Sequence, residues 1–126
     1  ELGILVFDVT SGPAAFVAEN SDLVASFLKV TADANAMWNS GEHEAEMLPV
    51  IAKDAGMDED ATAETIATFI FPDVDTQLSD KWLGGGSQDF MKGVAEVFVS
   101  AGSIDSALAS YENAVNTGPL AAANGM

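Results

Sequence analysis

The chain has 126 residues, of which 48% are hydrophobic and 19% are charged. This length predicts one domain, and this share of apolar residues excludes a disordered chain. Twenty acidic residues against four basic ones give a formal net charge of −16, which excludes nucleic acid as a partner because its backbone is also negative. The absence of cysteine excludes disulfides, thiolate catalysis and cysteine-ligated zinc.

The first ten residues carry a short apolar, β-branched stretch. This stretch is followed by Gly12 and Pro13, so it predicts one strand over about residues 4–10. A single strand is not stable without partners, so we expect that it either pairs between copies of the chain or belongs to a sheet in sequence not present here. Because the chain starts at Glu1 without Met, it is expected to be a mature form or a fragment. An unpaired strand edge also predicts self-association of the isolated chain.

A helical pattern covers about residues 21–116. Its first helix begins at Ser21, and further helices are expected near residues 46–55, 61–70, 74–83, 88–101 and 104–115. The Ala-rich tail at 117–126 is predicted to be frayed. The expected fold class is mostly α with one or a few short strands. The apolar stripe of the first helix consists of Leu23, Phe27, Val30, Ala34 and Met37, with Trp38 beside Met37 at its last position.

No pattern indicates a metal, a cofactor or a catalytic group. His43 and Glu44 begin like a zinc motif, but Met47 replaces the second histidine. Acidic residues at 58–60 and 73–75 lack the spacing of a calcium loop, and we interpret them as carboxylates at helix N-termini. The S-x-x-K pattern at residues 26–29 lacks its partner motifs. The glycines at 84–86 are interpreted as a flexible connector rather than a phosphate loop. Since none of these patterns forms a catalytic set, the chain is not expected to be an enzyme.

Asp8 is the strongest candidate for a binding residue, because it is charged within an otherwise apolar stretch. It either caps a turn with Thr10 and Ser11 or points into a cleft to hold a cation. Phe7 and Thr10 are further candidates for contact with a ligand.

Several segments of the chain together form a pattern of order and spacing that points to one family: residues 6–9, 15–16, 20–24, 51–57, 69–72, 76–78 and 94–104, with Tyr111 in the helix that follows. These segments resemble the taurine-binding proteins, which are periplasmic substrate-binding components of ABC importers for taurine and aliphatic sulfonates. The likeness covers nearly all of this chain and corresponds to the C-terminal portion, less than half, of a family member.

This resemblance implies a fragment of a two-lobe α/β fold, the type II periplasmic-binding fold, with a hinge strand at about residues 4–10. It implies a periplasmic or extracytoplasmic protein that delivers its ligand to an ABC permease. Asp8 matches the family's aspartate that contacts the taurine ammonium. The sequence departs from the family at residues 10–13, where the family continues a strand.

A second function stays open on the residues alone. The acidic helices are also compatible with an interaction module that docks a basic partner. No run of about 18 apolar residues occurs, so a membrane span is not expected.

Overall fold

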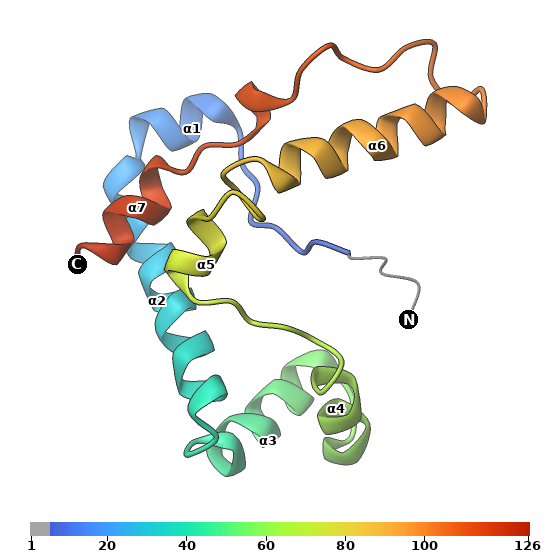
Figure 1. The fold of residues 1–126 in the computed structure, drawn as a ribbon. Coiled ribbons are helices and arrows are strands. Elements are labelled where there is room, and N and C mark those ends of the chain that lie inside the picture. The colour runs from blue at the N-terminus through green and yellow to red at the C-terminus, as the bar shows by residue number, and fades with distance from the viewer. Residues whose placement is uncertain (1–5) are drawn as a thin grey trace.

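The computed structural model describes residues 6–126, and within that range it consists of helices joined by loops (Figure 1). Helices hold 63% of the residues, which confirms the mostly α prediction. In chain order they are α1 (Ala14–Glu19), α2 (Ser21–Ser40), α3 (Glu44–Ala55), α4 (Glu59–Ile66), α5 (Val74–Leu78), α6 (Gly86–Ser100), the 3-10 turn η1 (Glu112–Ala114) and α7 (Gly118–Asn124).

The predicted strand is wrong for residues 6–10, which are irregular, and positions 4 and 5 lie outside the described residues. Among residues 6–126 there is no strand with which this segment could pair, and a lone strand has no ladder hydrogen bonds to hold it. Its backbone is fixed instead through the Phe7 ring, and Pro13 then forms the N-cap of α1, a helix that the sequence did not predict.

Local capping signals explain where α4 and α5 begin and where α3 ends. The Asp58 Oδ1 accepts a hydrogen bond from the Ala61 N–H at 2.8 Å, and the Asp73 Oδ1 accepts one from Thr76 at 2.7 Å. Both predicted helix-terminal carboxylates are therefore confirmed. Gly56 closes α3 with a φ of 67°, in the left-handed region that favours glycine, so this helix ends at residue 55 as its predicted range does.

The two C-terminal predictions are wrong. Residues 103–111 form a loop and not a helix, because side chains compete for backbone groups there. The Tyr111 hydroxyl accepts the Leu108 N–H at 3.3 Å, and the Ser110 hydroxyl accepts the Glu112 N–H at 3.2 Å. The tail is helical rather than frayed, because Pro119, Leu120 and the Ala123 methyl are buried in α7.

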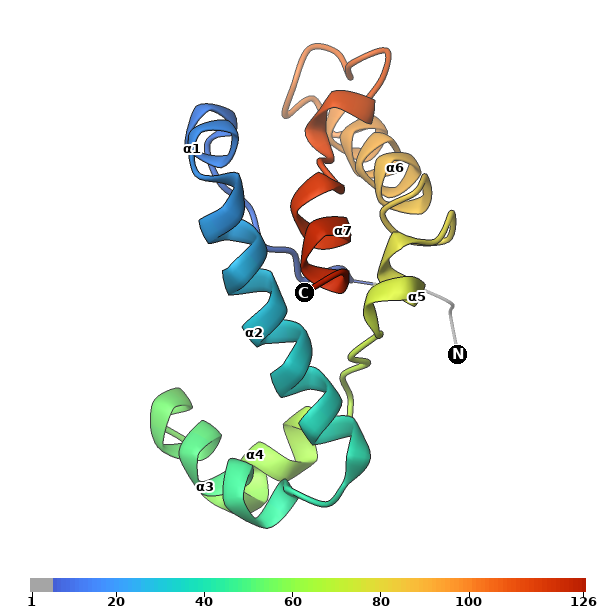
Figure 2. The same ribbon diagram turned by 90° about the vertical axis from the view of Figure 1, so that its left-hand side faces the viewer.

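The main packing contact joins α7 to α2 across the molecule (Figure 2). Ala25 of α2 is buried there, and α7 also contacts α5, where the Asn124 amide donates to Asp75 at 3.1 Å. A second pair, α3 with α4, lies at the far end of α2. Helix α6 belongs to none of the strongly packed helix pairs of the described chain and projects as an arm (Figure 1).

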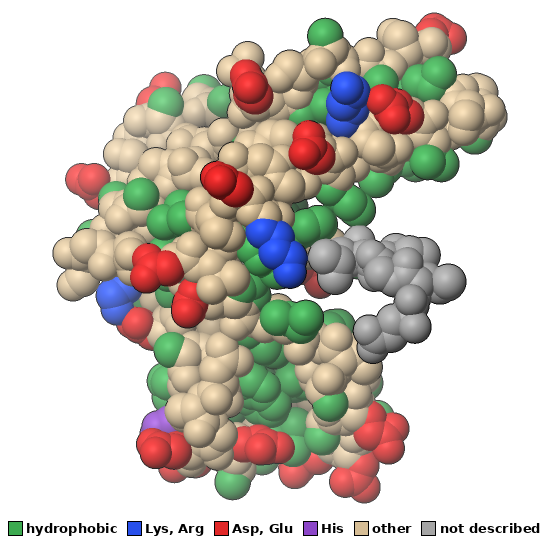
Figure 3. All heavy atoms as spheres, in the orientation of Figure 1, with side chains coloured by type: hydrophobic (Ala, Val, Ile, Leu, Met, Phe, Trp, Pro, Cys, Tyr) green, Lys and Arg blue, Asp and Glu red, His purple; other side chains and the backbone are tan. Residues whose placement is uncertain are grey.

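The molecule is unusually open for its size. Its accessible surface is 9050 Å². A compact monomer of 13.0 kDa exposes only about 6,300 Å², so about 2,700 Å² more is in contact with water than compact folding requires. Figure 3 shows hydrophobic side chains along the lower side of the α6 arm and on the body between that arm and α3 and α4. The helices therefore present apolar surface that lacks a partner among the described residues.

The cap of α5 predicts a measurable pH dependence. Hydrogen bonds from the Thr76 side chain and then from its backbone N–H lower the pKa of Asp73 below its ordinary 3.8. Because the folded state favours the carboxylate, this contribution to stability is complete above pH 3.8 and is lost as the pH falls through the lower folded pKa. In an NMR titration, Thr76→Val is expected to raise the Asp73 pKa toward 3.8. An unchanged pKa in the variant would contradict this assignment.

Candidate functional site

The candidate site lies where the N-terminal segment meets the start of α6. The Phe7 ring packs edge-on against Trp82, with ring centroids 5.1 Å apart, and lies 5.0 Å from Phe90 in a tilted arrangement. Such aromatic pairs add about 0.5–1.5 kcal/mol beyond the burial of their area. This aromatic cluster of Phe7, Trp82 and Phe90 anchors the chain directly before Asp8.

The structure separates the three predicted site residues by environment. Phe7 is half-buried in the aromatic cluster, whereas Asp8 and Thr10 are exposed. The Asp8 carboxylate forms no hydrogen bond or ion pair with another of the residues 6–126, so the turn cap with Thr10 and Ser11 is not formed. An anchored backbone thus presents to water a carboxylate that has no partner in the described part of the chain. A carboxylate of this kind can accept a charge-assisted hydrogen bond from a cation.

The turn before α6 is closely packed and is not the flexible connector that the sequence predicted. The Gly84 N–H donates to Ser79 at 3.0 Å, the Gly86 N–H to Asp80 at 2.9 Å and the Ser87 N–H to Trp82 at 2.8 Å. These N–H groups already donate to carbonyls of the turn. They are therefore not free to donate to a phosphate. The turn serves instead to place Trp82 against Phe7.

The remaining motifs are occupied by local structure. The Ser26 hydroxyl donates to the Asp22 carbonyl at 2.8 Å, and the Lys29 ammonium pairs with Asp33, so serine and lysine do not act on each other. His43 stands 3.8 Å from Glu46 at the exposed start of α3. Within the described chain no three potential metal ligands gather at one place, and no helix there has the length and apolarity to cross a bilayer.

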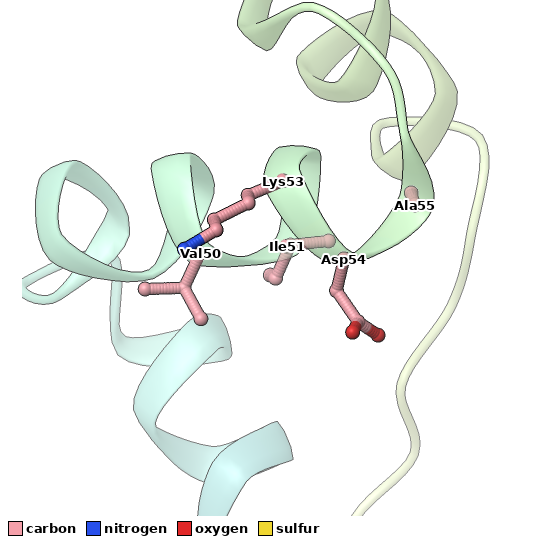
Figure 4. A pocket seen from close by; sticks show the side chains of 5 residues that line it. All are labelled: Val50, Ile51, Lys53, Asp54 and Ala55. Atoms are coloured by element: carbon pink, nitrogen blue, oxygen red, sulfur yellow. The ribbon is translucent and has the colours of Figure 1, made fainter.

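Neither of two hollows on the surface of residues 6–126 encloses a ligand site. The one in Figure 4 has a volume of about 580 Å³, but all five residues that line it belong to α3: Val50, Ile51, Lys53, Asp54 and Ala55. A single helix face cannot surround a ligand, and small-molecule sites bury most of their ligand. A neighbouring hollow of about 490 Å³ combines Lys53 with Asp58, Glu59 and Asp60 and is equally superficial.

Sequence reasoning missed the contact that positions Asp8. The apolar spacing of α6 includes Phe90, but nothing in the sequence pairs it with Phe7, 83 positions earlier. Comparisons of this chain with family models, with curated proteins and with solved structures found no match. What bears on the function of this chain is therefore the chemistry of its own residues and their resemblance to the taurine-binding proteins.

Proposed function

We propose that this chain is part of an extracytoplasmic solute-binding component of an ABC importer, and that the protein binds taurine or a related sulfonate for delivery to a permease. The observation that carries the proposal is the exposed Asp8 directly after the aromatic anchor, whose carboxylate has no partner among residues 6–126. Asp8 is the residue that the family resemblance assigns to the ligand ammonium. Its environment leaves that carboxylate available.

The openness of the α6 arm supports the same proposal. Val94 and Phe98 lie one turn apart on α6 and are exposed, as is Val97. A helix with one apolar face is built to cover another layer, and in a two-lobe α/β protein that layer is a sheet. We propose that the complete protein has the type II periplasmic-binding fold, with α6 in the helical layer of a lobe.

The direct test is calorimetry on the full-length product of the gene that encodes this chain. Taurine is expected to bind saturably. Isethionate, which carries a hydroxyl in place of the ammonium, is expected to bind more weakly, because it offers Asp8 no cation. No binding of either sulfonate would contradict the proposed function. Equal binding of the two would instead keep sulfonate binding and remove the role of Asp8.

A second candidate function is supported by the charge at α3 and α4. Residues 42–64 contain eight acidic side chains against Lys53, and Val50 and Met57 are exposed among them. Such a surface suits a basic amphipathic segment of another protein. In the same calorimeter, a salt-sensitive heat with a basic helical peptide and none with taurine would favour this function over solute binding.

A further inference from the structure

Helix α2 carries two apolar faces, and only one of them is covered. Helix α7 packs where Ala25 is buried, and Leu28 and Ala32 follow at helical spacing on the same face. The stripe predicted from the sequence lies on a different face and is largely exposed. The exposed fractions are 61% at Leu23, 57% at Phe27, 68% at Val30 and 42% at Met37.

The spacing of this exposed stripe is typical of a helix–helix seam. Its five residues follow one another at intervals of four, three, four and three, which is the a/d pattern of a heptad repeat: Leu23, Phe27, Val30, Ala34 and Met37. Helix α2 continues without interruption through all of them. A partner that fits such a seam is another helix with the same repeat.

We propose that a second copy of this chain occupies the stripe, and that the two α2 helices pack against each other in antiparallel orientation. Four of the five side chains of the stripe are large and apolar and are exposed over 42–68% of their area, so a second α2 helix would remove apolar surface from water along its whole length. The inference does not rest on the proposed solute binding, because it concerns α2 and not Asp8.

The charge distribution permits this contact and selects its direction. Although the chain carries −16, α2 contains only Asp22, Lys29 and Asp33, and the last two neutralise each other in an ion pair. The acidic residues of α3 and α4 follow the C-terminal end of α2 (Figure 2). A parallel pair would bring two such ends together. An antiparallel pair separates them by about 30 Å, the length of twenty helical residues, which exceeds the screening length of about 8 Å at physiological salt.

The first test compares two matched substitutions by light scattering and sedimentation between about 1 and 200 μM protein. Val30 on the stripe and Val50 on α3 are both valines on helices, with exposed fractions of 68% and 67%. The wild type and Val50→Glu are expected to be dimeric, whereas Val30→Glu is expected to be monomeric, because it would bury a charge in the seam. A wild type that stays monomeric throughout, or equal effects of the two variants, would overturn the proposal.

A second test does not depend on how well Val30→Glu folds. The chain has no cysteine, so single introduced cysteines report proximity without background. Antiparallel pairing places Leu23 of one copy beside Met37 of the other. A mixture of Leu23→Cys and Met37→Cys is expected to form mixed disulfides under mild oxidation, and Leu23→Cys alone is expected to form none. Cross-linking of Leu23→Cys alone, without mixed disulfides in the mixture, would contradict the antiparallel arrangement.

Discussion

Asp8→Asn in the full-length gene product is expected to weaken taurine binding by roughly 30-fold to several thousandfold. Loss of one partner from a desolvated, hydrogen-bonded charge pair costs about 2–5 kcal/mol, and each 1.4 kcal/mol is tenfold in affinity. Asparagine keeps the size of the side chain and removes its charge, so the change isolates the electrostatic contribution. Isothermal titration calorimetry of both proteins with taurine measures it.

The fold is expected to survive this substitution, because Asp8 is exposed and has no hydrogen-bond partner among residues 6–126. Asp105→Asn is the matched control, since Asp105 is an exposed aspartate in the loop after α6. The control is expected to bind taurine like the wild type. If both variants bind taurine as tightly as the wild type, Asp8 is an ordinary surface carboxylate and the assignment of its role fails.

The elements that the sequence predicts correctly are those with local causes. An aspartate cap is recognised from three or four consecutive residues, as at Asp58 and Asp73. Glycine in the left-handed region ends a helix for reasons of its own backbone, as at Gly56 and Gly102. These signals need no distant partner, so they can be recognised in the sequence before any tertiary contact is known.

The wrong predictions share a dependence on contacts far apart in the chain. The tail becomes the helix α7 because it packs against α2, which lies about ninety residues earlier in the chain, and its Leu120 and Ala123 side chains are buried. Residues 6–10 carry a strand pattern but lack a strand partner within the described chain. In α2 the apolar stripe itself was correct as a helical pattern. Periodicity, however, cannot tell which of two apolar faces is covered, and the structure covers the one with the smaller residues.

The candidate site likewise has one part that the sequence predicts and one part that depends on distant contacts. Asp8 is visible in the sequence, because a charge within an apolar stretch is conspicuous. The anchor that positions it requires Phe7, Trp82 and Phe90 to meet, and that meeting depends on the turn before α6. This turn requires glycine, and that requirement can be tested by substitution.

Gly86→Ala is expected to destabilise the chain by about 3 kcal/mol, at the upper end of the usual cost of overpacking. A Cβ atom at Gly86 would lie 2.6 Å from the carbonyl carbon of Lys81 and would press on its oxygen as well. Both atoms belong to the backbone, so no side chain can move aside. The turn would have to open, and the hydrogen bond from the Gly86 N–H to Asp80 would be strained with it.

Gly93→Ala is the matched control, because Gly93 lies in the middle of the same helix and a Cβ atom there meets no described neighbour within 4 Å. Alanine is expected to stabilise α6 by about 0.5–1 kcal/mol, since it restricts the unfolded chain more than glycine does. Urea unfolding of both variants at one fixed protein concentration measures the two changes. If the close approach of the Lys81 backbone is the reason that position 86 requires glycine, the two substitutions must change the free energy of unfolding in opposite directions. Two stabilising substitutions would show that the turn tolerates a side chain, and that another interaction holds Trp82 against Phe7.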